Sequence, residues 1–221
     1  MECWLTVSIL SMAKKDKRRL VEKLYDALNE IVSKQLVTDD FGYVRFERHG
    51  DVIVSQGTRE ALNRSDTKKT YVTATHWFDD FWFYVNVSVR KGEDGLSDLP
   101  FVSISFFQES DGELKQLFRA EWDNYNELAH PQPHWHITSN REESFDDLKE
   151  KEALDKDSPF AELMAESKKL DLPAMHFAMA GNWHEGKKTE MITSYTEAQQ
   201  MANWMNNLFD HVRVELAYAY G

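Results

Sequence analysis

Apolar residues recur at helical spacing near both ends of the chain. An amphipathic helix is predicted from about Asp16 to Leu36, because every third or fourth residue there is apolar. Its apolar stripe consists of Leu20, Val21, Leu24, Leu28, Ile31 and Val32. A second helix is predicted after the capping-box pattern Ser194-x-x-Glu197. Its wider stripe consists of Ala198, Met201, Ala202, Trp204, Met205, Leu208, Phe209 and Val212. The segment Val212–Leu216 fits either a continuation of this helix or a strand.

Alternating apolar and polar residues predict a run of β-strands between the two helices. Phe81–Arg90 is the clearest strand, because its odd-numbered residues are all apolar and its even-numbered residues are mostly polar. Tyr71–Trp77 is predicted to precede it across the turn Asp79-Asp80, whereas the polar segment Gly57–Lys69 predicts a loop. The other predicted strands are Tyr43–Arg48 and Val52–Ser55, which form a hairpin, then Phe101–Gln108, Leu114–Asp123, His134–Thr138 and Met175–Ala180.

The order of these elements predicts the fold class. We expect one α+β domain over residues 1–221, with a mainly antiparallel meander sheet and the N-terminal and C-terminal amphipathic helices packed on one face. A charged insertion at about 140–172 interrupts the pattern and contains a possible helix at Pro159–Leu170. We expect this acidic insertion to pack over the sheet, to move, or to dock a basic protein partner.

Composition and charge narrow the functional classes. The chain has 221 residues, of which 42% are hydrophobic, so a substantial core is expected. Its formal net charge of −12 repels phosphate backbones and makes non-specific nucleic-acid binding an unfavoured function. Cys3 is the single cysteine, which rules out a disulfide within the chain and a zinc site made of several thiolates, and fits a cytoplasmic protein.

The N-terminal region does not predict a membrane protein. No apolar stretch reaches the roughly 20 residues that a membrane span needs, and no signal peptide is recognised. The sequence from Met12 resembles a natural start, so either Met1 or Met12 is the native first residue.

Histidines concentrate in the run His130-Pro131-Gln132-Pro133-His134-Trp135-His136. In this strand His134 and His136 share a face, and in the strand before it Arg119, Glu121 and Asp123 share a face. If the apolar residues Phe118, Trp122, Trp135 and Ile137 are buried together, the two polar faces must also meet. His176 has the matching parity in its own predicted strand.

This polar face predicts either a metal centre or an acid–base site. His-x-His presents two imidazoles on one side of a strand, and a carboxylate with a further histidine completes a sphere suited to zinc or manganese. The candidate metal ligands are His130, His134, His136, His176 and Asp123. The candidate catalytic residues are Arg119 as an anion clamp, Glu121 and Asp123 as bases, and His134 and His136 as acid–base groups. The alternative is a solvated sheet face on which the histidines have no chemical role.

Two family resemblances follow from these residues. His136-Ile137-Thr138 is similar to half of the His-x-Thr signature of two-histidine phosphoesterases, but the second element would be His176-Phe177-Ala178, which lacks the hydroxyl. The layout Phe118-Arg119-x-Glu121-Trp122-Asp123 followed by His130-Pro131-x-x-His134-x-His136 resembles a group of uncharacterised prokaryotic proteins, some of them encoded in toxin–antitoxin or anti-phage gene clusters. This resemblance covers the C-terminal half and implies a prokaryotic cytoplasmic protein.

Two functions remain open at this point. The first is metal-dependent hydrolysis of a phosphoester at the histidine-centred site. The second is a non-catalytic part of a multi-protein defence or toxin–antitoxin assembly, which fits the lack of a recognisable nucleophile or phosphate-binding loop.

Overall fold

The computed structural model describes residues 19–36, 38, 42–65, 68–91, 98–123, 133–137, 177–178 and 195–220. Its helices are α1 (Leu20–Ala27), the π-helical segment η1 (Leu28–Val32), α2 (Ser33–Gln35) and α5 (Tyr195–Tyr220). Its strands are β1 (Phe46–His49), β2 (Val52–Ser55), β3 (Arg59–Arg64), β4 (Lys69–Phe78), β5 (Phe81–Lys91), β6 (Asp98–Ser110), β7 (Glu113–Trp122), β8 (His134–Ile137) and β9 (Phe177–Ala178).

The strands form an antiparallel sheet in the order β1-β2-β5-β6-β7-β8-β9. Neighbours from β5 to β9 follow one another in the sequence, as in a meander. The predicted α+β class and the antiparallel pairing are therefore confirmed. The insertion at 140–172, the capping residue Ser194 and the choice between Met1 and Met12 concern residues outside the described part of the chain.

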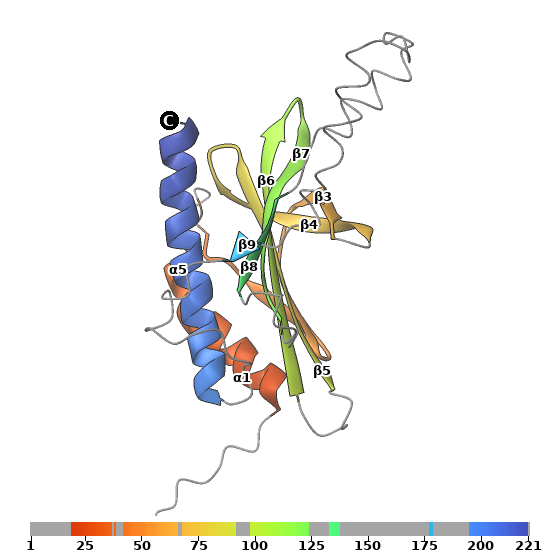
Figure 1. The fold of residues 1–221 in the computed structure, drawn as a ribbon, viewed down its shortest axis with the longest axis vertical. Coiled ribbons are helices and arrows are strands. Elements are labelled where there is room, and N and C mark those ends of the chain that lie inside the picture. The colour runs from red at the N-terminus through yellow and green to blue at the C-terminus, as the bar shows by residue number, and fades with distance from the viewer. Residues whose placement is uncertain are drawn as a thin grey trace, which may run out of the picture.

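One large apolar cluster joins the helices to the sheet. It contains the stripes of α1, η1 and α5 together with the residues of β5 that were predicted to share a face. Phe209 of α5 lies at its centre, with ring centroids 5.2 Å from Trp77, 4.8 Å from Phe83 and 5.6 Å from Phe106. Figure 1 shows α1 and α5 on one side of the sheet. The helix α5 includes Val212–Leu216, so the strand alternative for that segment is wrong.

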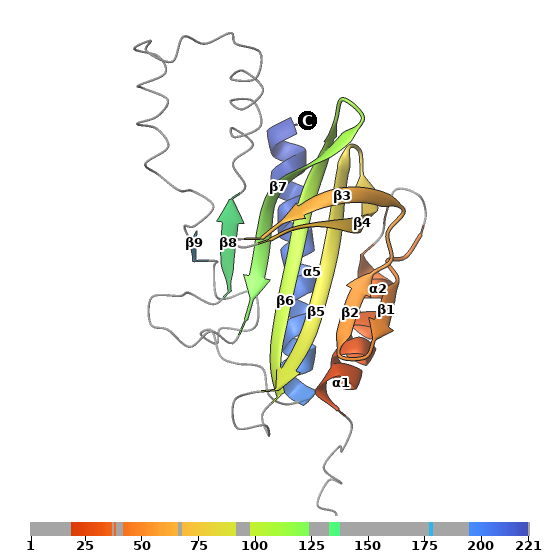
Figure 2. The ribbon, with the colours of Figure 1, turned by 90° about the vertical axis from the view of Figure 1, so that its right-hand side faces the viewer.

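A two-stranded ribbon, β3–β4, covers part of the opposite face of the sheet. The first half of β4 pairs with β3, and only its last residues, from Thr75, pair with β5. Since β2 pairs with the far end of β5, the two hairpins share one edge of that strand. Figure 2 shows β3 and β4 crossing over β5 and β6. A small apolar cluster of Ala61, Ala74, Phe107 and Leu114 holds the ribbon in place.

The prediction of a loop at Gly57–Lys69 was wrong, because Arg59–Arg64 forms the strand β3. Ala61 is the one buried side chain in β3, so the segment has no apolar alternation that a sequence pattern could detect. Its backbone pairs with β4 and its polar side chains face solvent or the sheet. Among the described residues, no helix is both long and apolar enough to cross a membrane.

Candidate metal centre

The pairing of β7 with β8 brings the predicted polar faces together. Arg119 lies opposite His136 and Glu121 lies opposite His134 in the antiparallel register. The apolar side chains meet on the other face, where the rings of Phe118 and Trp135 make an edge-to-face contact at 5.4 Å. The facing of the two polar sets expected from parity is therefore confirmed. The expected joint burial of the apolar set is wrong in part, because Phe118 and Trp135 are half-buried and Ile137 is 41% exposed.

An irregularity in β7 adds a residue that parity did not predict. Phe118 pairs with Phe106, but Gln116 pairs with Phe107, so Leu117 is an extra residue without a partner across the strands. Leu117 and Phe118 both pack against the helix-side core. Because of this bulge, Gln116 shares the ribbon-side face with Arg119 and Glu121, although strict alternation from Glu121 would place it on the other face.

Three electron-pair donors converge on this face. The Nε2 atoms of His134 and His136 are 2.8 Å apart, and Glu121 Oε2 is 2.9 Å from His136 Nε2 and 3.7 Å from His134 Nε2. The exposed fractions are 0% for His134, 3% for His136 and 7% for Glu121. The expectation of a solvated sheet face is therefore wrong at these positions.

The short contacts limit where protons can lie in the metal-free site. A proton on His136 Nε2 can be donated to Glu121 Oε2, while His134 Nε2 turns an electron pair toward the same proton. If His136 instead carries its proton on Nδ1, three electron pairs face one small volume with nothing positive between them. A cation at this point would replace the proton and satisfy all three donors.

The carboxylate of Glu121 is held in its ionised form. Burial by itself would raise the pKa of Glu121, but the nearby imidazoles of His134 and His136 and the charge of Arg119 outweigh it, so the pKa lies well below its ordinary value. The Arg119 Nε atom is 2.6 Å from Glu121 Oε1. One carboxylate oxygen therefore faces the guanidinium and the other faces the imidazoles.

The guanidinium of Arg119 is itself buried, with 4% of the residue exposed. Its Nη1 atom donates a hydrogen bond to the Arg64 carbonyl of β3 at 2.5 Å. With Nε facing Glu121 and Nη1 facing Arg64, this side chain is placed to orient the carboxylate. A role in holding Glu121 fits this geometry better than the predicted role as an anion clamp.

The donor set suits a transition-metal ion. Two imidazole nitrogens and one carboxylate oxygen are the ligands that zinc uses in three-residue sites. With zinc–nitrogen bonds of 2.0–2.1 Å, a tetrahedral site needs the two nitrogens to be about 3.3 Å apart. The 2.8 Å separation of the Nε2 atoms would therefore open by roughly 0.5 Å on binding, which small rotations of two imidazole rings can supply.

The other predicted site residues have different outcomes. Asp123 follows the end of β7 and does not belong to the group of ligand atoms that lie within 4.8 Å of one another, so its role as a ligand or base stays a prediction. His130 and His176 are outside the described residues, and their roles as ligands also stay predictions.

Sequence reasoning missed two residues that support the site, Arg64 and Gln116. Arg64 contributes a backbone carbonyl, which a pattern of side chains cannot predict. Gln116 lies on this face only because of the bulge. A polar glutamine in a predicted strand beside Arg119 was the available signal.

Comparisons of the chain with protein-family models, with curated proteins and with solved structures found no match. The resemblance to uncharacterised prokaryotic proteins therefore stays a prediction, and the chemistry of the site must be argued from its own residues.

Proposed function

We propose that this protein binds a divalent transition-metal ion, zinc or manganese, through Glu121, His134 and His136, and that the bound metal serves the hydrolysis of a phosphoester. The observation that carries the proposal is the convergence of His134 Nε2, His136 Nε2 and Glu121 Oε2 in a buried site. Buried polar atoms at such short separation are costly unless a proton or a cation lies between them.

Three protein ligands would suit a catalytic metal, and a fourth from His130 or His176 would make the metal structural. Structural zinc sites close the coordination sphere with four protein ligands, whereas catalytic sites use three and leave a position for water or substrate. The described residues offer three. A water molecule at the remaining position would become a hydroxide nucleophile near neutral pH, which is the chemistry that a metal contributes to hydrolysis.

Charge favours an anionic substrate. Arg119 and Glu121 neutralise each other at a separation of 2.6 Å, and the two imidazoles would bind the metal as neutral ligands. The centre would then carry the charge of a divalent cation in surroundings from which water is largely excluded. Such a charge is stabilised by an anion in the open position, and a phosphoester supplies one that also needs a nucleophile.

The first test is elemental analysis of protein purified without a histidine tag or a chelator. We expect near-stoichiometric metal in the wild type and none in the His134→Ala/His136→Ala variant. His49→Ala is the matched control, because His49 lies on β1 with 67% of its side chain exposed and takes no part in the cluster. Metal bound equally by the wild type and by the His134→Ala/His136→Ala variant would refute this site.

The second test is hydrolysis of a para-nitrophenyl phosphodiester by the metal-loaded protein. We expect turnover that disappears with the His134→Ala/His136→Ala variant and persists with His49→Ala. Stoichiometric metal without turnover of any phosphoester in a broad panel would leave metal binding standing and refute the hydrolase function.

A non-catalytic role in a defence or toxin–antitoxin assembly is the competing proposal. The burial of all three donors favours it, as does the lining of three surface pockets among the described residues by other side chains. In that case the hydrogen-bonded cluster stiffens the β7–β8 pair, and a protein partner binds elsewhere. The cytoplasmic location expected from the sequence belongs to both proposals. Absence of metal from a folded wild type, together with co-purification of one defined partner from the native host, would favour this role.

A further inference from the structure

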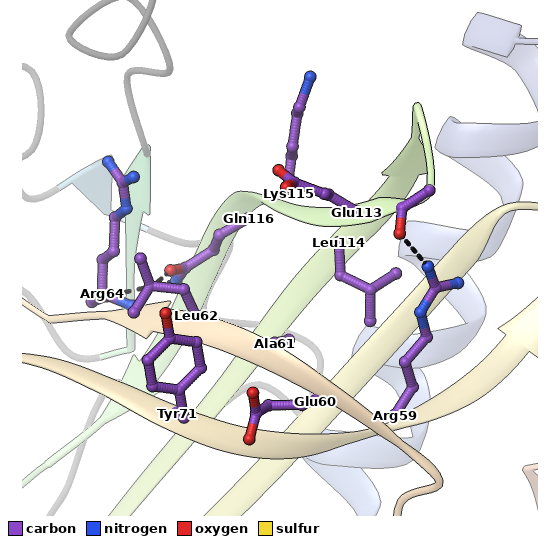
Figure 3. A pocket seen from close by; sticks show the side chains of 11 residues that line it. Arg59, Glu60, Ala61, Leu62, Arg64, Tyr71, Glu113, Leu114, Lys115 and Gln116 are labelled. Atoms are coloured by element: carbon purple, nitrogen blue, oxygen red, sulfur yellow. Dashed lines mark hydrogen bonds between the residues drawn. The ribbon is translucent and has the colours of Figure 1, made fainter.

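The end of the β3–β4 ribbon is fastened to the site by a chain of hydrogen bonds. Gln116 Oε1 accepts a hydrogen bond from the Arg64 backbone N–H at 2.7 Å, and Gln116 Nε2 donates one to the Arg64 carbonyl at 3.3 Å. The same carbonyl accepts from Arg119 Nη1. Figure 3 shows Gln116 reaching Arg64 at one side of a pocket of about 270 Å³. The Arg64 carbonyl thus accepts hydrogen bonds from both Gln116 and Arg119.

We infer that Gln116 is a positioning residue for the metal centre. It acts through the Arg64 carbonyl and Arg119 to fix the orientation of the Glu121 carboxylate. The inference rests on the proposed metal binding and identifies what sets the geometry of that site. The ligands themselves lie on β7 and β8. The β3–β4 ribbon would thus help to set the geometry of the metal centre through the Arg64 carbonyl.

The strand pattern explains why a side chain is needed for this task. β3 pairs with β4 and not with β7, so no ladder of backbone hydrogen bonds sets the distance between Arg64 and Arg119. Gln116 is 3% exposed and bonds to both backbone groups of Arg64, which fixes this residue in translation and in rotation. Without it, the position of this carbonyl relative to β7 would depend on the β3–β4 pairing and on contacts made by other residues of the ribbon.

Arg119 transmits this constraint because it is one rigid planar group. Its Nε atom faces Glu121 Oε1 and its Nη1 atom donates to Arg64, so a shift of the carbonyl tilts the plane that faces the carboxylate. Partners of this kind, which orient a ligand without touching the metal, typically change metal affinity by 10- to 100-fold. Because Gln116 acts one step further away, we expect about a tenfold effect, at the low end of that range.

The test compares Gln116→Met with Arg59→Met. Methionine has a similar length to glutamine and removes both hydrogen bonds to Arg64. The control removes the ion pair between Arg59 Nη1 and Glu109 Oε2 at 2.5 Å. This contact also ties β3 to the sheet, but at the end of the strand away from Arg64, and Glu109 lies opposite Leu114 in the register. The apolar cluster that anchors the ribbon is untouched in both variants.

Two readouts are measured. The first is cobalt(II) titration, which gives the affinity and a ligand-field spectrum that reports the coordination geometry. We expect Gln116→Met to weaken cobalt binding about tenfold and to change the spectrum, and Arg59→Met to leave both as in the wild type. Unchanged affinity and spectrum in Gln116→Met, or equal losses in the two variants, would overturn the inference.

The second readout needs no metal and separates the inference from the proposed function. It is the NMR signal of the Arg119 Nε–H in chelator-treated protein, assigned by its loss in Arg119→Lys. We expect Gln116→Met to shift this signal and speed its exchange with water, while Arg59→Met leaves it unchanged. If the wild type binds no cobalt but this signal responds as expected, the metal proposal fails and the positioning of Arg119 stands. If Gln116→Met leaves the Arg119 signal unchanged, the inference that Gln116 positions Arg119 is refuted, whether or not the protein binds metal.

Discussion

The buried ion pair Arg119–Glu121 allows a direct test of the site, because each charge should stabilise the folded protein only when the other is present. Three variants are compared in chelator-treated protein: Glu121→Gln, Arg119→Met and the double variant Arg119→Met/Glu121→Met. Each single variant leaves one charged group buried without its counter-charge. The double variant removes both charges and keeps most of the volume.

The structure sets the size of the expected effects. Only 4% of the Arg119 side chain and 9% of the Glu121 side chain are exposed, so solvent screens the pair little. Removing one partner of a buried pair costs about 3–5 kcal/mol. We expect about 3 kcal/mol for Glu121→Gln, because Arg119 keeps its hydrogen bond to the Arg64 carbonyl, and about 2 kcal/mol for Arg119→Met, because His136 still donates to Glu121.

The double variant should cost far less than the sum of the single variants. Replacing both members of a buried ion pair by apolar side chains is often neutral, and the remaining cost is the loss of the hydrogen bonds from His136 to Glu121 and from Arg119 to the Arg64 carbonyl, about 1–2 kcal/mol. The sum of the single effects is about 5 kcal/mol, so the coupling energy should reach about 3 kcal/mol.

The assay is urea unfolding followed by the fluorescence of the seven tryptophans. Each free energy of unfolding is compared with that of the wild type at the same pH. Single variants that cost less than about 1 kcal/mol, or effects that add without coupling, would refute the conclusion that this pair is buried and mutually compensating.

Three further predictions concern pH, a close backbone approach and the core. Because the pKa of Glu121 is lower in the folded protein than its ordinary value of 4.5, its contribution to stability is complete above that value and is lost as pH falls below it. In chelator-treated protein, the wild type should therefore lose more of its urea midpoint than Glu121→Gln between pH 6 and pH 3, and equal losses would contradict this assignment. Gly57→Ala should destabilise by about 3 kcal/mol, because its Cβ would lie 2.2 Å from the Thr73 carbonyl oxygen and 2.4 Å from that of Ala74. The control Gly42→Ala meets only Thr38 Oγ1 at 3.6 Å and should change the thermal midpoint little; similar midpoints for both variants would show that the approach is not tight. Phe209→Ala should cost about 3–5 kcal/mol in urea unfolding, since this fully buried ring packs on Trp77, Phe83 and Phe106, and a cost below 1 kcal/mol would argue against that core.

Local pattern was enough to predict most of the sheet. Hairpins such as Phe46–His49 with Val52–Ser55 and Lys69–Phe78 with Phe81–Lys91 have strong alternation and short turns, which are properties of neighbouring residues. The strand β3 was missed because its stability comes from pairing with β4 and from one buried alanine, neither of which leaves an apolar period in the sequence.

For the candidate site, the sequence by itself determined which side chains share a face. Side chains alternate along a strand, so the contact of Phe118 with Trp135 on one side necessarily placed Arg119, Glu121, His134 and His136 together on the other. The roles expected for His130, His176 and Asp123 depend on how segments beyond these strands are placed, and alternation within a strand carries no information about that.

Only the tertiary structure decided that the polar face is buried and what orients it. The ribbon that contacts Arg119 comes from more than fifty positions earlier in the chain and contributes a backbone carbonyl, which every residue type possesses. The bulge at Leu117 turned Gln116 toward the same face, against the local period. Local alternation selects a face of a strand, whereas burial, register shifts and carbonyl contacts depend on distant segments of the chain, so they are decided only when the chain has folded.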